Sequence, residues 1–464
     1  MVLYDTSVCF SISLNESMEG EWVMKKLIVI VMLLWTASVK KYFIMVVIGL
    51  LGIVSIIRAQ NGPWTSKCPL PERNSWLASC TLDGKIYVIG GATDNTVLST
   101  VEVYNPVTDT WDTTKAKMSD SRWGLSANVV DGKIYAIGGV KGASGPALSK
   151  VEVYDPGKDT WEMKAEMPTA RVGFASCVVD DKIYVLGGAA SEPFQTPLKT
   201  VDVYDPKADS WNTSKTSLST AIAYHSACVV DGKIYLIGGT GQSPWTGSAK
   251  IEEYDSASDT WTRKKNMPTG RWALTSCVEN GKIYVIGGTM SPGSGGSSRV
   301  EEYNPATDTW KTKAEMPTPR LALSASVFEG KIYTFGGAIV SYPWIPSVAT
   351  VEGYDPSLDQ STDVGNPSLV QHPNQFLLFQ NYPNPFNPET TILYKLATEG
   401  EVNLSIYNQL GQKVAVPVSE EQDAGVHEVH FNASNLVSGV YFCELQIYSS
   451  VGDFTHTKKL MLVK

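Results

Sequence analysis

Four arginines recur at one position of an internal repeat, and they are the side chains of this sequence best suited to hold a charged ligand. They are Arg122, Arg171, Arg271 and Arg320. If the repeats are arranged around a central channel, these guanidinium groups would gather at its opening, which we call the mouth. There they would bind a carboxylate, sulfate or phosphate through bidentate hydrogen bonds. A structural role is the alternative, because the corner that carries each arginine belongs to the repeat and its arginine could bridge neighbouring repeats. One repeat has Ile222 at this position, and another has Asn74 next to Arg73.

Aromatic side chains and one histidine form a second candidate set, which differs from repeat to repeat as ligand-specific residues should. The members just beyond the corners are Trp76, Trp123, Tyr224, His225 and Trp272, and two more, Trp245 and Trp344, lie in long variable loops. Aromatic rings stack against sugar rings or apolar side chains, so this set predicts a binding site. For the loop residues Trp245 and Trp344, the alternative is that their rings only cover the ends of the repeats.

The supply of other reactive residues argues against several classes of enzyme. His225 is the only one of five histidines within the repeats, which is too few for a multi-histidine copper or zinc site. The sequence contains no Gly-x-Ser-x-Gly elbow and no phosphate-binding loop. With a net charge of −9, the chain has no basic domain to neutralise the phosphates of a nucleic acid. We therefore expect no metal, no cofactor and no nucleic-acid partner.

Six copies of one phrase must position these side chains. Each copy ends in a Gly-Gly pair whose first members, 48 to 51 residues apart, are Gly90, Gly138, Gly187, Gly238, Gly287 and Gly336. A copy contains an apolar first strand, a Lys-Ile-Tyr second strand, a third strand that reads Val-Glu-x-Tyr in most copies, and a fourth strand at a tryptophan. This period and pattern predict an all-β fold built of four-stranded units.

The order Gly-Gly, Val-Glu-x-Tyr-Asp/Asn-Pro and Asp-x-Trp resembles the kelch motif, which implies a six-bladed β-propeller over residues 61–356. The last repeat lacks its fourth-strand tryptophan, whereas Trp64 stands before the first repeat with the matching spacing. We therefore predict that residues 63–67 complete the sixth blade and close the ring without a free sheet edge. The variable loops and the corners then share one face, where binding specificity normally lies.

Residues 1–60 are predicted to be a leader. Two uncharged apolar runs, Leu27–Val39 and Tyr42–Ile57, each follow a pair of lysines. The second run is short for a membrane span but suits a signal-peptide core, with Ala59 at a suitable cleavage point. The simplest interpretation is a signal beginning near Lys40, with the start assigned too far upstream and no stable membrane span after cleavage. A retained anchor or a membrane hairpin is the alternative.

A second domain is predicted at residues 376–464, after a polar linker at 357–375. Its expected strands, which suggest a small immunoglobulin-like antiparallel β-sandwich, are Thr391–Tyr394, Val402–Tyr407, Val426–Phe431, Gly439–Gln446 and Lys458–Val463. The phrase Tyr-Pro-Asn-Pro-Phe-Asn-Pro at 382–388 and later phrases resemble the C-terminal sorting domain of the type nine secretion system of Bacteroidetes. This resemblance implies outer-membrane secretion machinery as a partner and a final location outside the cell or on its surface. An ordinary accessory β-domain is the alternative.

The cysteines are not expected to form a disulfide framework. Cys80, Cys177, Cys228 and Cys277 share one first-strand position, and equivalent positions of different blades usually lie too far apart to bridge. We predict that they are buried packing residues. Whether Cys68 pairs with Cys80 stays open.

Together these patterns favour a secreted or surface-displayed propeller that binds a glycan or protein without catalysis. The first alternative is a sugar mutarotase or epimerase acting on an acidic sugar, as in kelch proteins that act on sialic acid, since this chemistry needs only one general acid and one base. Arg171 and Arg271 would then hold the carboxylate, and His225 would move the proton. An acidic side chain beside His225 would favour the enzyme. A structural stalk or adhesin without a discrete ligand is a further alternative.

Overall fold

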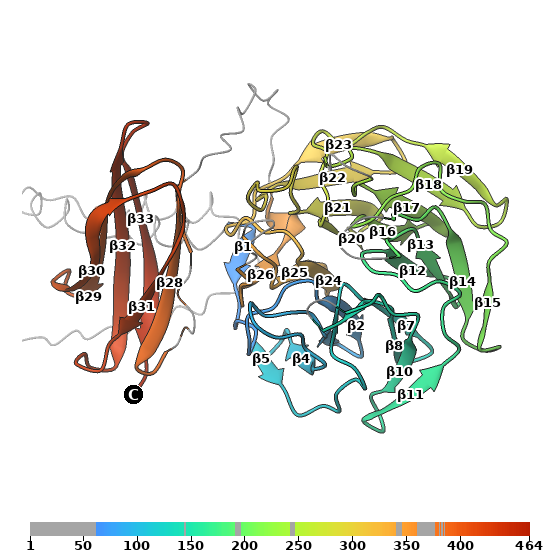
Figure 1. The fold of residues 1–464 in the computed structure, drawn as a ribbon, viewed down its shortest axis with the longest axis horizontal. Coiled ribbons are helices and arrows are strands. Elements are labelled where there is room, and N and C mark those ends of the chain that lie inside the picture. The colour runs from blue at the N-terminus through green and yellow to red at the C-terminus, as the bar shows by residue number, and fades with distance from the viewer. Residues whose placement is uncertain are drawn as a thin grey trace, which may run out of the picture. The chain divides into compact units, whose positions relative to one another are not determined.

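The computed structural model describes residues 62–142, 145–190, 196–241, 246–339, 346–359, 376–379, 381, 384 and 386–464. The predicted leader and all but the first three residues of the predicted linker lie outside this part of the chain. From β1 to β26 the chain forms six four-stranded antiparallel sheets, which radiate from one axis as the blades of a wheel (Figure 1). In the described ranges no helix is both long and apolar enough to cross a membrane.

Each blade has four strands, numbered along the chain, and the blades are numbered 1 to 6 in the order of their innermost strands. The innermost strands are β2 (Ala78–Leu82), β7 (Ser126–Val130), β12 (Ala175–Val179), β16 (Ser226–Val230), β20 (Thr275–Glu279) and β24 (Ser324–Phe328). The second strands are β3 (Lys85–Ile89), β8 (Lys133–Ile137), β13 (Lys182–Leu186), β17 (Lys233–Ile237), β21 (Lys282–Ile286) and β25 (Lys331–Phe335).

The third strands are β4 (Val101–Asn105), β10 (Val151–Asp155), β14 (Val201–Asp205), β18 (Ile251–Asp255), β22 (Val300–Asn304) and β26 (Val351–Tyr354). The outermost strands are β5 (Thr110–Asp112), β11 (Thr160–Lys164), β15 (Ser210–Asn212), β19 (Thr260–Arg263), β23 (Thr309–Thr312) and, in blade 6, β1 (Trp64–Ser66). Two short strands, β6 (Arg122–Trp123) and β9 (Val140–Lys141), pair at one end of blade 2, and a 3₁₀ turn, η1, follows β26 at Pro356–Leu358.

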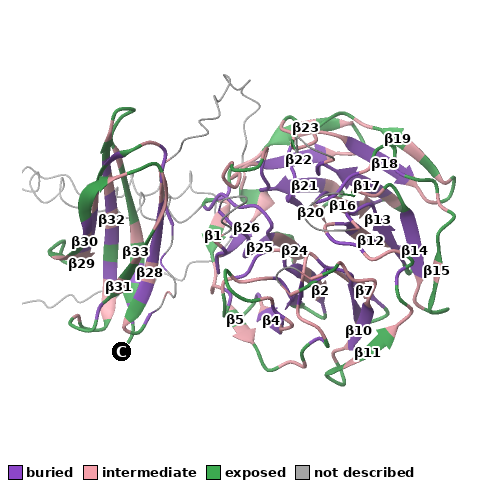
Figure 2. Ribbon diagram, viewed as in Figure 1, coloured by how far each residue is buried: buried purple, intermediate pink, exposed green. Residues whose placement is uncertain are grey.

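The second strands are buried because each blade packs between two others. In β8 every residue from Ile134 to Ile137 is buried, and most of the length of the middle strands is purple in Figure 2. A two-residue turn joins the first two strands of blade 1, with Asp83 at φ 49° and Gly84 at φ 72°. Positive φ at both positions matches the twist of a tight hairpin, which explains the Asp-Gly sequence there.

The Gly-Gly pairs stand where adjacent blades approach too closely for a side chain. A Cβ atom on Gly90 would lie 2.6 Å from the carbonyl oxygen of Arg122 in the next blade. On Gly138 it would lie 2.7 Å from the ring of Phe174. Both glycines also have φ of 60°, so a larger residue would be strained and would push the blades apart.

A tyrosine, an aspartate and a tryptophan form a clasp between each blade and the segment that follows the preceding blade. In blade 2 the hydroxyl of Tyr154 donates to Asp159 at 2.5 Å, and Asp159 accepts from the backbone N–H of Ala116 at 2.9 Å. The indole of Trp161 donates to the carbonyl oxygen of Ala116 at 2.9 Å. The same clasp recurs in the other five blades, which gives the repeated Asp-x-Trp phrase its structural role.

Residues from both ends of the propeller close blade 6. Strand β1 pairs antiparallel with β26, with Trp64 opposite Tyr354 and their rings 4.8 Å apart. The clasp of this blade takes its tryptophan from β1, whose indole donates to Ala314 at 2.9 Å, and its aspartate, Asp359, from the other end of the domain. This is the closure that the tryptophan pattern predicts.

The C-terminal domain consists of two antiparallel sheets. One contains β27 (Leu377–Leu378), β28 (Glu389–Leu396) and β31 (Gly425–Asn432), and the other contains β30 (Lys413–Gln422), β29 (Gly400–Asn408), β32 (Gly439–Ser449) and β33 (Phe454–Leu462). Residues of both sheets, among them Tyr394, Leu404 and Leu445, share one core. Strand β30 was not expected from the sequence. It carries Pro417, which is tolerated because β30 is an edge strand.

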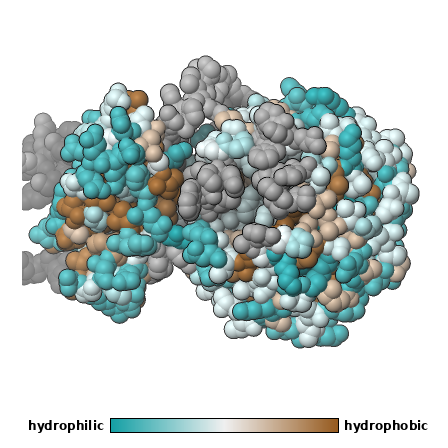
Figure 3. Space-filling view, in the orientation of Figure 1, coloured by the Kyte–Doolittle hydropathy of each residue, from teal (hydrophilic) through white to brown (hydrophobic). Residues whose placement is uncertain are grey.

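Some apolar residues lie on the surface of this domain, where Figure 3 shows brown atoms. Leu410 and Val437 are 82% and 77% exposed. Leu410 occupies the turn between β29 and β30, so its exposure follows from the tight connection rather than from a missing core partner.

The cysteine prediction is confirmed for the described residues. Cys68 and Cys80 are not bonded to each other, and the four first-strand cysteines are free thiols buried near the axis. Burial raises the pKa of Cys228 to about 12, so this thiol stays protonated and unreactive.

Candidate functional site

Four residues turn the chain into each innermost strand, and these corners build the centre of one propeller face. The corners are residues 74–77, 122–125, 171–174, 222–225, 271–274 and 320–323. The second residue of a corner pairs with the residue after a Gly-Gly pair, as Val172 does with Ala189 and Trp272 with Thr289. Because the long variable loops start at those paired residues, corners and loops share this face, which we call the loop face.

The third residue of each corner belongs to a closed ring of six backbone hydrogen bonds around the axis. Each N–H donates to the carbonyl oxygen of the equivalent residue in an adjacent blade. The ring residues, joined by N–O distances of 2.5 to 3.3 Å, are Trp76, Gly124, Gly173, Tyr224, Ala273 and Ala322. All six have φ between 50° and 64°, which costs energy for the residues other than glycine. The ring therefore holds Trp76 and Tyr224 in fixed positions at the mouth of the channel.

Four of the predicted aromatic residues gather at this ring. The ring of Trp76 lies 5.9 Å from that of Trp123 and 5.1 Å from that of Tyr224, and the rings of Tyr224 and Trp272 are 5.9 Å apart. Tyr224 and Trp272 are buried, whereas Trp76 and Trp123 are partly exposed. The accessible aromatic surface of this cluster therefore comes from Trp76 and Trp123. Trp245 and Trp344 lie outside the described residues.

A small cavity lies within the ring. Its volume is about 120 Å³, and it is lined by the ring residues and by the residue that follows each of them, with no Asp, Glu, Lys or Arg side chain in that lining. Sites that enclose a small molecule usually measure about 300 to 1,000 Å³. This cavity is therefore too small to enclose a sugar or a peptide.

The four predicted arginines lie in the interior of the blades and not at the mouth. Each is fully buried and pairs with the acid on the third strand of its own blade: Arg122 with Glu152, Arg171 with Asp202, Arg271 with Glu301, and Arg320 with Glu352. The N–O distance is 2.6 Å for Arg271 and 2.7 Å for Arg320. The guanidinium also donates to the carbonyl of the first glycine of its blade, as from Arg271 to Gly287 at 2.6 Å.

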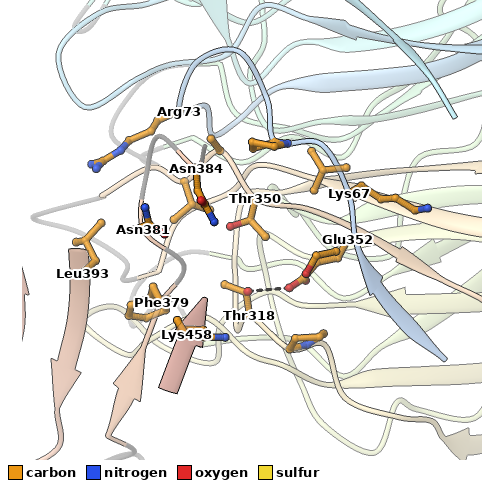
Figure 4. A pocket seen from close by; sticks show the side chains of 16 residues that line it. Lys67, Arg73, Thr318, Thr350, Glu352, Phe379, Asn381, Asn384, Leu393 and Lys458 are labelled. Atoms are coloured by element: carbon orange, nitrogen blue, oxygen red, sulfur yellow. Dashed lines mark hydrogen bonds between the residues drawn. The ribbon is translucent and has the colours of Figure 1, made fainter. Parts of the chain in front are cut away.

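This placement corrects the expectation that the guanidinium groups face the mouth. A buried cation needs an opposite charge, and the repeated third-strand acid supplies one within the same blade. Burial lowers the pKa of Arg271, and the Glu301 carboxylate opposes that effect. In blade 6 the hydroxyl of Thr318 also donates to Glu352 at 2.7 Å (Figure 4). The geometry thus favours a structural role, with each arginine crossing its own blade rather than bridging two.

His225 packs between blades and also lines the small cavity within the ring, but it is buried and presents almost no surface at the mouth. A Cβ atom on Gly187 of blade 3 would lie 3.0 Å from the imidazole, and the other blades carry leucine or phenylalanine at this corner position. Burial lowers the pKa of His225 to about 4, so the ring is neutral at physiological pH. Within the described ranges no group of three or more His, Cys, Asp or Glu side chains could hold a metal ion.

Blade 1 contains an acid whose protonation state should control stability, because Asn74 stands where four other blades have arginine. Burial, together with the nearby Glu72 carboxylate, raises the pKa of Glu102 from 4.5 to about 7. The native state therefore holds this proton more tightly than the unfolded chain does. Stability from this group is complete below pH 4.5 and is lost as the pH rises through 7.

We expect the wild-type protein to lose on the order of 3 kcal/mol of stability, relative to Glu102→Gln, between pH 4 and pH 8. The amide cannot titrate, so the variant lacks this decline while it keeps every other pH effect. Denaturant unfolding of both proteins at a series of pH values measures the difference. Parallel curves would show that Glu102 does not titrate in this range.

Comparisons with known proteins match this architecture. Residues 124–337 match the family described as the KLHDC2/KLHL20/DRC7 Kelch-repeats domain, and residues 77–114 match the Kelch motif. Residues 380–463 match the Secretion system C-terminal sorting domain.

Two individual proteins are similar over parts of the chain. The F-box/kelch-repeat protein At4g39580 of Arabidopsis thaliana is 39% identical over 59 residues, which is 13% of this chain and 16% of that protein. This chain therefore spans about one sixth of the length of that relative. The solved structure of YjhT superimposes with a TM-score of 0.53 and 15% identity, over 61% of this chain and 95% of that one. At this identity the likeness shows the fold alone.

Proposed function

Because this chain is a kelch-repeat protein that carries a sorting domain for export by the type IX secretion system to the cell surface or outside, we propose that its propeller is a non-catalytic binding module. Its ligand is a glycan or a protein that contacts the loop face. The sorting domain engages the secretion machinery, and the propeller carries the specificity.

The observation that carries the proposal is the pair of partly exposed indoles, Trp76 and Trp123, next to the rigid ring. Flat aromatic surface held in one position is suited to stacking against a sugar ring or an apolar side chain, because little conformational freedom is lost on binding. The four corner arginines cannot take this role, because they are buried inside the blades and paired with third-strand acids.

The alternative function, a sugar mutarotase or epimerase, receives no support from the described mouth. That reaction needs a general acid and a general base close to the bound sugar. The lining of the axial cavity contains no carboxylate, and His225 is buried and neutral. Arg171 and Arg271, which would hold the carboxylate of an acidic sugar, are fully buried in ion pairs.

We expect a glycan or peptide ligand to raise the melting temperature of the protein and to lose at least tenfold in affinity in Trp76→Ala or Trp123→Ala. Each truncation removes stacking worth about 1 to 3 kcal/mol, and tenfold corresponds to about 1.4 kcal/mol. A thermal-shift screen with neutral glycans, acidic glycans and peptides finds the ligand, and calorimetry measures affinity.

Tyr448→Ala is the matched control, because Tyr448 is a 49% exposed aromatic residue of the C-terminal domain. It should bind as the wild type does. A ligand whose affinity is unchanged in both tryptophan variants would place binding elsewhere than the aromatic cluster.

A further inference from the structure

Blade 1 keeps the acceptors of the internal arginine site but lacks the arginine. In blade 5 one guanidinium nitrogen of Arg271 binds the Gly287 carbonyl and another binds Glu301. The equivalent residues of blade 1 are Asn74, Gly90 and Glu102. The amide of Asn74 donates to the Gly90 carbonyl at 2.8 Å and so replaces the first of these bonds. Its side chain is too short to replace the second.

Among the described residues Glu102 consequently has no hydrogen-bond or ion-pair partner, although it is only 5% exposed. The carbonyl oxygen of the Asn74 side chain, 1% exposed, also has no partner there. A second carboxylate, Glu72, is close enough to act on Glu102 electrostatically. An uncompensated buried carboxylate is costly, and a nearby like charge adds to that cost.

Blade 4, which also lacks the arginine, shows how the same loss is compensated internally. Ile222 stands at its corner, and the acid Glu252 accepts a hydrogen bond from the hydroxyl of Ser219 at 2.6 Å. The ammonium of Lys250 lies 3.9 Å from Glu252. Blade 1 has neither substitute in its described residues, and Glu72 has the wrong charge to serve as one. Among the described residues, the uncompensated third-strand acid is therefore the one in blade 1.

We propose that blade 1 binds an external guanidinium group, which pairs with Glu102. In four other blades the equivalent acid pairs with the guanidinium group of an arginine side chain. The acid of blade 1 is therefore expected to suit a planar, delocalised cation better than an ammonium. The group is either a free guanidino compound or an arginine side chain of a bound protein. This site does not depend on the aromatic cluster and is tested separately from it.

The test is thermal unfolding of the full exported protein at pH 8 with methylguanidine, acetyl-arginine amide or methylammonium, each at millimolar concentrations well below those that denature. We expect methylguanidine to raise the melting temperature by on the order of 2 °C, in a saturable way, and methylammonium to give a much smaller shift. At pH 5 the shift should disappear, because Glu102 is then protonated. An equal shift with acetyl-arginine amide would identify an arginine side chain as an acceptable source, and its absence would restrict the site to free guanidino compounds.

Two variants make the result decisive. Asn74→Arg supplies the guanidinium internally, so it should abolish the methylguanidine shift and raise the melting temperature without any ligand. Glu102→Gln should abolish the methylguanidine shift without the ligand-independent rise in melting temperature expected for Asn74→Arg. This second variant keeps the proposal testable if Asn74→Arg does not fold. No saturable shift in the wild type, or an equal shift in Glu102→Gln, would overturn the proposal.

Discussion

Deleting residues 63–67 should lower the melting temperature of the propeller by at least about 10 °C. The deletion removes β1, its pairing with β26, and the indole of Trp64, which contacts Tyr354 and donates to Ala314. Truncating a fully buried aromatic residue costs about 3 to 5 kcal/mol, and each kcal/mol is worth about 2 to 4 °C in a large domain. Trp64 is only partly buried, but the deletion also removes the whole strand and its backbone hydrogen bonds. The deletion also leaves β26 as a free edge. Calorimetry measures the change, and light scattering measures the expected aggregation.

The matched control is Trp161→Ala, which removes the same clasp in blade 2 without opening the ring. Trp64→Ala should cost as much as Trp161→Ala, because the local contacts are equivalent. The full deletion should cost more than either substitution. If the deletion and Trp161→Ala unfolded at the same temperature, closure by β1 would contribute nothing beyond its local contacts.

Arg271→Ala should destabilise the propeller by about 3 to 5 kcal/mol, because it leaves the Glu301 carboxylate buried without its cation. The Gly287 carbonyl also loses the hydrogen bond at 2.6 Å. We expect a fall in melting temperature of about 10 °C at pH 8, measured by denaturant and thermal unfolding. Below the unfolding transition the variant should bind the ligand of the loop face as tightly as the wild type.

Replacing both partners separates the charge from the packing. Arg271→Met combined with Glu301→Leu should recover much of the lost stability, since a buried ion pair exchanged for apolar residues of similar volume is often neutral. A single variant Arg271→Ala that is as stable as the wild type would refute the structural role. If Arg271→Ala were stable but no longer bound the ligand, Arg271 would be a ligand-binding residue rather than a structural one.

The repeat made the fold predictable, because short-range patterns carry most of a propeller blade. Gly-Gly, Val-Glu-x-Tyr and Asp-x-Trp each specify a strand or its end, and six copies in phase specify six blades. The missing tryptophan after Tyr354 even identified the closing strand at Trp64. Strand β30 was not predicted from the sequence, because Pro417 interrupts the residue pattern of a strand. The proline is acceptable only because β30 lies at the edge of its sheet.

The candidate site was less predictable, because residue type and repeat position do not state where a side chain points. The same list of arginines suits a charged mouth or a set of internal ion pairs. Arg271 and Glu301 lie 30 residues apart in sequence, and only the pairing of strands brings them to 2.6 Å. In the sequence His225 stands out as the one histidine within the repeats. In the structure it packs against Gly187 of the adjacent blade as a neutral side chain.

The sequence by itself determined the number of blades, their closure, the sorting domain and the set of aromatic residues at the corners, since each depends on local phrases and their order. The tertiary structure decided which side chains face solvent. The arginines are buried and pair with the third-strand acids, because an unpaired charge in the interior costs too much free energy. The closed ring of backbone hydrogen bonds then set Trp76 and Tyr224 at the mouth, which no single repeat could specify.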